Sequence, residues 1–111
     1  MPLTRITLGD TYSDRQIALM STILHQTLVD SFAVPIEDCF QLIDKLPANQ
    51  RIFSTHYLSG GRSEGFVLIQ ITAGRPRTRE QKQDFYRMLN ERFGRELNIS
   101  PDDVMVIIQF N

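Results

Sequence analysis

The residues that could do chemistry begin at the start of the chain, where Pro2 follows the initiator methionine. A small residue at position 2 normally permits removal of Met1, which would leave a secondary amine on a rigid ring. Such an amine is a base when neutral and a hydrogen-bond donor when protonated, so it can move a proton or polarise a carbonyl. A proline in second position often has no role. Here the next residues open a predicted strand, which would hold the amine at a sheet instead of on a frayed tail.

The second candidate is the segment Gly-Arg-Pro-Arg-Thr-Arg at positions 74–79, which precedes a predicted helix. Helix N-termini favour acidic residues because the helix dipole places positive charge there, yet this segment is basic. Pro76 keeps the chain extended, so Arg75 and Arg77, two residues apart, share a side. Backbone N–H groups and guanidinium groups together would bind a carboxylate or a phosphate. The alternative is a solvated basic turn that pairs with nearby acids.

Asp38 is the third candidate, at the start of a predicted strand, although the similar placing of Asp103 also suits a turn-and-cap role. Cys39 is interpreted as a small buried apolar residue. His25 and His56 lie far apart, and no Cys, His and Asp cluster has metal-ligand spacing, so no metal is expected. The sequence has no glycine-rich phosphate loop and no nucleophile motif, so no cofactor is expected either.

Composition limits the partners. The chain has 111 residues, 41% hydrophobic and 23% charged, which suits a single domain over residues 1–111. Twelve Lys and Arg residues against thirteen Asp and Glu give a net charge of −1, so no nucleic acid is expected as a partner. Apolar runs are far shorter than the ~20 residues of a membrane span. With one cysteine and no visible signal peptide, we expect a cytoplasmic protein.

The elements that must position these residues follow an internal repeat. An offset of 65 residues relates segments 2–46 and 67–111, with residues 47–66 as a linker. Apolar positions of one half align with apolar positions of the other, and several residues are identical. The matched pairs include Leu3 and Leu68, Ile6 and Ile71, Gly9 and Gly74, Gln16 and Gln81, Leu24 and Leu89, and Asp38 and Asp103.

Each half is predicted to fold as strand, helix, strand. In the first half we expect strands over 3–8 and 39–43 around an amphipathic helix that ends before Pro35. Ser13 and Gln16 have the spacing of a capping box at its start. The helix's apolar positions are Ile17, Met20, Ile23, Leu24, Leu28 and Phe32.

The second half repeats this plan, with strands over 66–72 and 104–110 and a capping box from Thr78 to Gln81. The helix between them has apolar residues at Phe85, Met88, Leu89, Phe93 and Leu97. The linker could add a short hairpin or an irregular strand around 52–57.

Two such units give an α/β (α+β) fold: a duplicated βαβ unit with a four-stranded mixed sheet and both helices on one face. The third and fourth strands have apolar residues on both sides, so the face without helices should be an interface. We therefore expect a homo-oligomer. The alternative is that residues 47–66 fold back as a lid over that face. A ferredoxin-like interaction domain has the same element order, and antiparallel pairing within each half would favour it.

Taken together, the chain resembles the tautomerase superfamily, the fold of 4-oxalocrotonate tautomerase, and most closely its malonate semialdehyde decarboxylase-like branch. The resemblance runs over nearly the whole chain, and Arg75, added to the more widely shared Arg77, points to the decarboxylase branch. It is carried by Met-Pro-Leu at 1–3, His25, Leu-Val-Asp-Ser-Phe at 28–32, Val34-Pro35 with Asp38, Gly-Arg-Ser at 61–63, Arg-Pro-Arg-Thr at 75–78, Glu-Gln-Lys at 80–82, Phe-Tyr at 85–86 and Ile-Ser-Pro-Asp-Asp-Val at 99–104.

The resemblance implies a trimer and a cofactor-independent enzyme that acts on a small carboxylate, an oxo acid, through an enolate. In it Pro2 is the catalytic amine, Arg75 and Arg77 hold the substrate carboxylate, and Asp38 assists through a hydrogen bond or an activated water. Members commonly continue past the last strand into a segment with Trp and Phe that helps to wall the pocket, and this sequence ends at Asn111. A non-catalytic oligomeric module that binds an anionic metabolite is the alternative function.

Overall fold

One mixed sheet organises the molecule. The computed structural model describes residues 2–111, so the predicted removal of Met1 lies outside the described residues. The strand order is β2-β1-β3-β4, with β1 parallel to β2, β1 antiparallel to β3 and β3 parallel to β4. Parallel pairing within each half excludes the ferredoxin-like alternative. The strands are β1 (Leu3–Gly9), β2 (Phe40–Leu46), β3 (Val67–Ala73) and β4 (Val104–Phe110).

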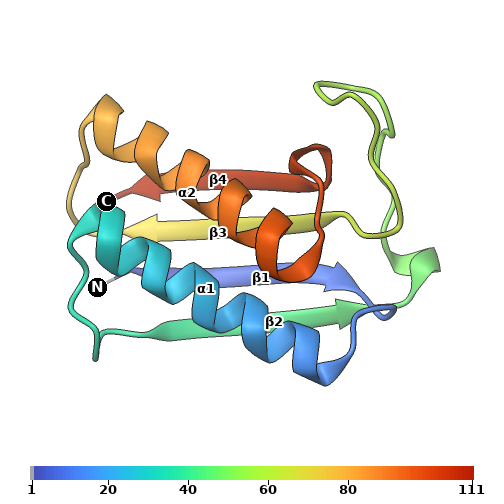
Figure 1. Ribbon diagram of the computed structural model, residues 1–111, viewed down its shortest axis with the longest axis horizontal. Coiled ribbons are helices and arrows are strands. Elements are labelled where there is room, and N and C mark those ends of the chain that lie inside the picture. The colour runs from blue at the N-terminus through green and yellow to red at the C-terminus, as the bar shows by residue number, and fades with distance from the viewer. Residues whose placement is uncertain (1) are drawn as a thin grey trace.

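Two helices, α1 (Asp14–Phe32) and α2 (Arg79–Leu97), cover one face of the sheet (Figure 1). Both begin with the predicted capping box, from Ser13 and from Thr78. Both are followed by one residue in the left-handed conformation, Ala33 or Asn98, each with φ 55°. Two short 3-10 helices complete the elements, η1 (Ala48–Gln50) and η2 (Pro101–Asp103). The predicted fold class is therefore confirmed.

The core lies between the helices and the covered face of the sheet. Strand alternation turns Thr4, Ile6 and Leu8 of β1 toward the helices, and all three are buried. From the helices, the largest fully buried side chains are Phe32, Met20, Leu24, Leu28, Phe85, Leu89 and Phe93. None of the helices in residues 2–111 has the length and apolar character needed to cross a membrane.

Some local predictions were wrong. β2 starts at Phe40 and extends to Leu46, beyond the predicted range 39–43, because its pairing with β1 continues along the whole strand. Residues 52–57 form no strand and contain only bends, a turn and irregular chain. Cys39 is exposed, since it precedes β2 at the edge of the sheet, so its interpretation as a buried residue is corrected.

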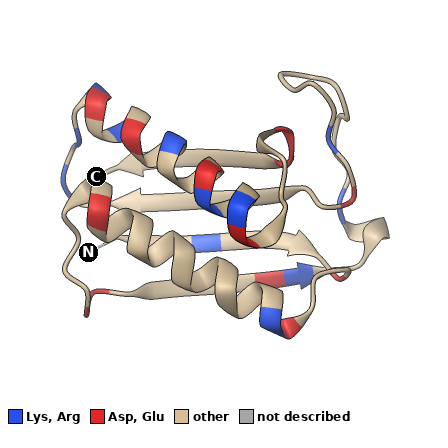
Figure 2. Ribbon diagram, in the orientation of Figure 1, with Lys and Arg blue, Asp and Glu red and all other residues tan. Residues whose placement is uncertain are grey.

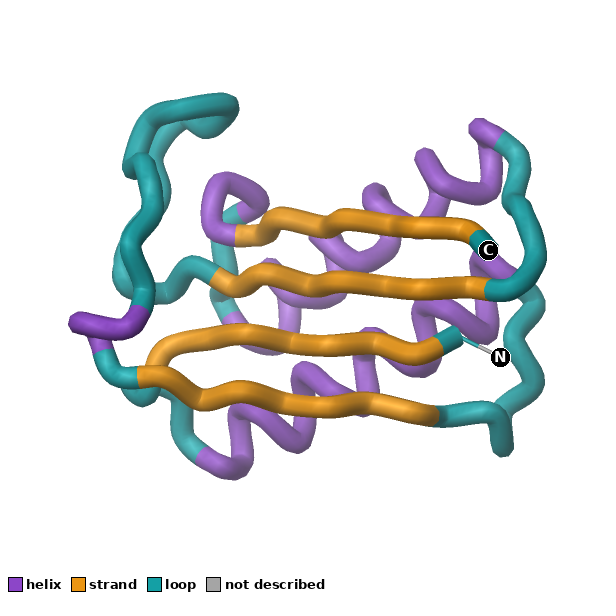
Figure 3. Tube along the Cα trace, turned by 180° about the vertical axis from the view of Figure 1, so that it is seen from behind, coloured by secondary structure: helices purple, strands orange, loops and turns teal. Residues whose placement is uncertain are grey.

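The other face of the sheet is open, and the lid alternative is wrong. Figure 3, seen from that side, shows the four strands in front and residues 47–66 beyond the ends of the strands. On this face Leu3, Phe40 and Leu42 keep 42–53% of their surface exposed. Arg5 and Asp44 form a two-bonded ion pair among them, at 2.6 and 3.2 Å. Charges are otherwise sparse on the sheet and dense on α2 (Figure 2).

Residues 47–66 are fixed at the end of the sheet where β1 and β2 finish, which we call the loop end. Asp103 is 8% exposed, and its carboxylate accepts hydrogen bonds from the amide and the hydroxyl of Ser63, both at 2.6 Å. The Tyr12 hydroxyl donates to the Gly65 carbonyl at 2.5 Å. Arg51 donates to the carbonyls of Phe66 and Glu64 at 2.5 and 2.8 Å. These bonds hold the linker against the sheet.

Candidate active site

The predicted site residues meet at the opposite end of the sheet, which we call the cavity end. Here β1 and β2 begin, β3 ends, α1 finishes and α2 starts (Figure 1). A cavity of about 290 Å³ opens there. Pro2, Asp38, Arg75 and Arg77 all line it, so the structure brings all four together. The remaining lining residues are Ala33, Val34, Pro35, Ala73 and Gly74.

Pro2 contributes from the first position of the described chain, directly before β1, and it is buried. Its place is fixed by β1, the second strand in the sheet, which pairs with a neighbour on each side. Pro2 therefore lies at the sheet and not on a frayed tail, as predicted.

The two arginines converge on the end of α1. Arg75 and Arg77 each donate from Nη2 to the Phe32 carbonyl oxygen, at 3.3 and 3.1 Å. Arg77 also donates from Nη1 to the Arg75 carbonyl. Because the last four carbonyls of a helix have no partner within it and form the negative end of its dipole, α1 gives both cations an anchor. Arg75 and Arg77 were predicted to share a side, and both do contact the same carbonyl oxygen.

Arg77 is the more enclosed of the two. Its guanidinium lies over the Phe32 ring, 5.1 Å from the centroid, while Arg75 is exposed. Burial first, and then the neighbouring Arg75 charge, lower the pKa of the Arg77 guanidinium from its ordinary value. The Arg77 Nε is buried without a hydrogen-bond partner. Two adjacent cations with spare donors, held in place before any ligand arrives, suit a carboxylate.

Asp38 is placed by the turn between α1 and β2. Its amide donates to the Pro35 carbonyl at 2.9 Å, and its side chain is partly buried. His25 of α1 lies 2.6 Å from the Ile36 carbonyl through Nε2, so α1 is joined to the middle of the same turn. Asp38 also lines a narrow space with Pro2 and His25. Asp38 therefore borders the same space as Pro2 and the α1 residue His25.

This arrangement has three parts. The arginines offer positive charge and donors for a carboxylate and for an oxygen that becomes negative. Pro2 offers a ring nitrogen, and Asp38 a carboxylate that can accept a hydrogen bond. Within residues 2–111 no group of three His, Cys, Asp or Glu residues could hold a metal ion.

Sequence reasoning missed the role of Phe32 at this site. It was placed on the apolar side of its helix, and its side chain is indeed fully buried. Its carbonyl nevertheless accepts hydrogen bonds from both arginines, and the Arg77 guanidinium lies over its ring. The available signal was its position as the last apolar residue before the predicted helix end at Pro35, where carbonyls lack partners.

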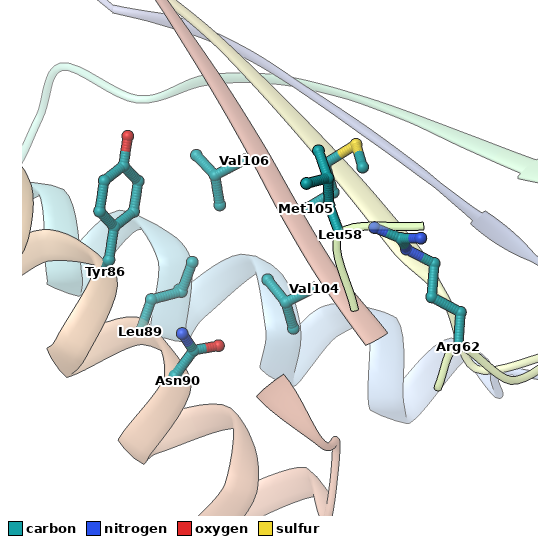
Figure 4. A pocket seen from close by; sticks show the side chains of 8 residues that line it. All are labelled: Leu58, Arg62, Tyr86, Leu89, Asn90, Val104, Met105 and Val106. Atoms are coloured by element: carbon teal, nitrogen blue, oxygen red, sulfur yellow. The ribbon is translucent and has the colours of Figure 1, made fainter. Parts of the chain in front are cut away.

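A second cavity of similar volume lies along the outer edge of β4, and it includes none of the predicted site residues. Figure 4 shows Tyr86 and Asn90 of α2 on one side and Leu58 and Arg62 of the linker on the other. Arg62 already donates to two carbonyls of its own loop. The wall between is apolar, from Leu89, Val104, Met105 and Val106.

Comparisons with known proteins agree with this picture. The family model described as "Tautomerase enzyme" matches residues 38–111. The probable tautomerase YrdN of Bacillus subtilis (strain 168) is 32% identical over 111 residues, which are 100% of this chain and 85% of that protein.

Among solved structures, a malonate semialdehyde decarboxylase with described decarboxylase and hydratase activities has a TM-score of 0.91 at 34% identity, over 98% of this chain and 84% of that one. A fused 4-OT trimer has a TM-score of 0.79 at 22% identity, over 98% and 85%, and shares the fold. The matched residues, the relative and the fold agree with one another: this chain belongs to the tautomerase family.

Proposed function

We propose that this protein is a cofactor-independent enzyme that uses Pro2, freed by removal of Met1, on a small oxo acid. The reaction is keto-enol tautomerisation, decarboxylation of the malonate semialdehyde type, or both. The observation that carries the proposal is that Pro2, Asp38 and two guanidinium groups line one cavity of about 290 Å³. The similarity to a malonate semialdehyde decarboxylase, a protein also studied as a proline-to-alanine variant, supports it.

Both reactions pass through an enolate. In tautomerisation a base removes the enol O–H proton, the electron pair forms the carbonyl, and carbon C3 takes a proton. In decarboxylation the bond between C2 and the carboxylate carbon of a 3-oxo acid breaks, its electron pair moves to the carbonyl oxygen, and CO2 leaves. The enolate carbon is then protonated. In both, positive charge beside the developing oxyanion lowers the barrier, and the arginine pair supplies it.

The protonation state of Pro2 decides between the two. A neutral amine accepts the proton in tautomerisation, whereas a cationic amine polarises the carbonyl in decarboxylation. An α-amino group ordinarily titrates near ~8. The Asp38 carboxylate favours the cationic amine through its charge, whereas burial and the two arginines favour the neutral amine.

We also propose that the protein assembles as a homotrimer through its open sheet face. That face carries exposed apolar side chains that the chain's own residues 2–111 leave uncovered. A fused 4-OT protein of the same fold is a trimer. We expect the assembly to act in the cytoplasm, without nucleic acid or membrane partners.

The test combines an intact mass with two assays. Protein whose mass shows that Met1 is absent should ketonise phenylenolpyruvate or decarboxylate malonate semialdehyde. Pro2→Ala in the same Met-free form should lose roughly 10²–10⁴-fold in kcat, the usual contribution of a positioned acid or base. Any fraction that retains Met1 should be inactive, because its proline nitrogen is an amide.

The matched control is Val67→Ala, since Val67 occupies the equivalent place at the start of β3 and is fully buried. That variant should lose stability and keep its turnover per folded molecule. Full activity in Pro2→Ala would end the enzyme proposal. Binding of a carboxylate that depends on the arginines, without turnover of either substrate, would favour a binding module instead.

A further inference from the structure

Phe32 is the residue through which the core reaches the arginine pair. It ends α1, and its side chain is 0% exposed. Its ring packs against Phe85 of α2, with centroids 5.2 Å apart and planes tilted by 31°. Packing between α1 and α2 therefore holds the Phe32 ring in place independently of Arg77.

Arg77 lies over the same ring. The guanidinium carbon lies 5.1 Å from the ring centroid, within the ~6 Å over which a cation is attracted to an aromatic face. Because Arg77 is partly buried, little water screens that attraction, and such contacts are stronger when desolvated. The ring thus constrains how far the Arg77 guanidinium lies from the core.

The Phe32 carbonyl adds the second fixed point. It accepts from Nη2 of Arg77 at 3.1 Å and from Nη2 of Arg75 at 3.3 Å. One residue therefore contacts Arg77 through its ring and its carbonyl, and ties Arg75 to the same oxygen. These contacts help to hold two like charges close together, beside the bond from Arg77 to the Arg75 carbonyl.

We propose that Phe32 is a positioning residue that holds the two arginines in the arrangement that binds a carboxylate. The inference rests on the proposed function, because it assumes that the arginines bind the substrate carboxylate. It predicts a division of effects. Weakening the ring's attraction for Arg77 should raise the Kd and KM of a carboxylate ligand, and should lower kcat by a smaller factor because Pro2 is untouched.

The test keeps the shape of the core. Phenylalanine with one, two or three ring fluorines, introduced at position 32, loses its attraction for a cation in steps while it retains the ring. Malonate is the binding probe, measured by calorimetry, and malonate semialdehyde the kinetic one. We expect the malonate Kd and the KM to rise stepwise, by about three- to tenfold with three fluorines, and kcat to fall by a smaller factor than KM rises.

Phe85 is the matched control. It is equally buried and touches the same ring, but it is not the ring under Arg77. The same fluorine series at position 85 should change Kd and KM less than twofold. Equal effects at both positions, or no effect at position 32, would overturn the proposal, as would a wild-type protein that does not bind malonate.

Failure of the proposed function gives a different result. If Pro2→Ala turns over normally while Arg77→Ala and the fluorine series at position 32 both weaken malonate binding, the enzyme mechanism is wrong and the role of Phe32 remains. If Pro2→Ala is inactive and Arg77→Ala abolishes malonate binding, but the fluorine series has no effect, only the role of Phe32 is wrong.

Discussion

The cavity end and the loop end of the sheet are built on the same backbone plan and filled differently. The 65-residue offset sets Pro2 against Val67, Asp38 against Asp103 and Arg77 against Tyr12. The helix ends match closely, with φ 55° at both Ala33 and Asn98. At the cavity end these positions surround an open space of about 290 Å³, whereas at the loop end they are bonded to the linker.

This difference shows how equivalent positions of one repeated backbone can either stabilise the fold or line a candidate active site. Asp103 has Ser63 as a donor from within the chain, and Tyr12 has the Gly65 carbonyl as an acceptor. Arg77 at the cavity end and Arg51 at the loop end each keep a buried Nε without a partner, so the ends differ in their other bonds: Arg51 donates to two carbonyls of the linker, whereas Arg77 faces the cavity.

The largest expected effect is the difference in catalytic activity between substitutions of Arg77 and of Arg51, which donate to main-chain carbonyls at the cavity end and the loop end. Arg77→Ala should lower kcat/KM by roughly 10²–10³-fold, since a preorganised donor to a developing anion is lost. Arg51→Ala at the loop end should lower the unfolding temperature and leave kcat/KM of the folded protein unchanged. Steady-state kinetics and thermal unfolding of both variants measure this. A large kinetic defect in Arg51→Ala would remove the distinction between the ends.

The next largest effect is an expected difference between substitutions of Asp103 and of Asp38. Asp103→Asn should lower the free energy of unfolding by about 2–3 kcal/mol, because a buried carboxylate loses charge-assisted bonds to Ser63. Asp38→Asn should shift the ratio of decarboxylation to tautomerisation toward tautomerisation, since the proposed Pro2 cation loses its counter-charge, whereas Asp103→Asn should leave that ratio unchanged. Urea unfolding and the two substrate assays, run side by side, decide this. An equal shift of the ratio in both variants, or no shift in Asp38→Asn, would contradict it.

A smaller effect depends on pH. Burial first, and then the negative charge of Asp103, raise the pKa of Tyr12, while Arg51 opposes them. The folded state therefore holds this proton more tightly than the unfolded state, whose tyrosine titrates near ~10. The stability that Tyr12 contributes is complete below pH ~10 and is lost as the pH rises through the folded-state pKa.

Tyr12→Phe tests this directly. At pH 8 the wild type should be more stable than the variant by about 1 kcal/mol, the usual contribution of one hydrogen bond. The gap should narrow as the pH rises beyond 10, and urea unfolding at several pH values follows it. Turnover should be unchanged in the variant. A gap that widens with pH would mean that the sign of the pKa change is wrong.

The smallest effect concerns the helix ends. Ala33→Gly should stabilise the protein by about 0.5–1 kcal/mol, because alanine is strained at φ 55° and glycine is not. Asn98→Gly should change stability less, since asparagine tolerates this conformation. Thermal unfolding of both proteins measures the difference. Equal shifts would contradict this, because they would show that alanine is no more strained than asparagine at φ 55°.

Much of the fold could be predicted from the sequence, because its signals are local. Ser13 with Gln16 and Thr78 with Gln81 identify the helix starts, and both capping boxes form. The extent of β2 was underestimated, since Asp44 and Lys45 do not look like strand residues. Asp44 joins the sheet because Arg5 on the adjacent strand pairs with it, and pairing between strands is not visible along one chain.

The linker and the site show where sequence reasoning ends. No strand forms at 52–57 because the Arg62 guanidinium takes the carbonyls of Ser54 and Tyr57, which a strand would need for its ladder. The four site residues could be chosen from their types and spacing. The anchoring of Arg75 and Arg77 on the Phe32 carbonyl could not, because it depends on how the end of α1 meets the loop in space.

The position of Pro2 has a practical consequence for anyone who expresses this protein. An affinity tag fused before Pro2 would keep the ring nitrogen an amide, which would prevent the proposed amine chemistry, and would place extra chain next to a buried residue that lines the cavity. A tag after Asn111 leaves from the same end, since the Asn111 amide donates to the Ala73 carbonyl at 3.0 Å and Ala73 lines the cavity. Purification handles and fluorescent labels therefore belong in the exposed turn around Tyr57, at the far end of the sheet.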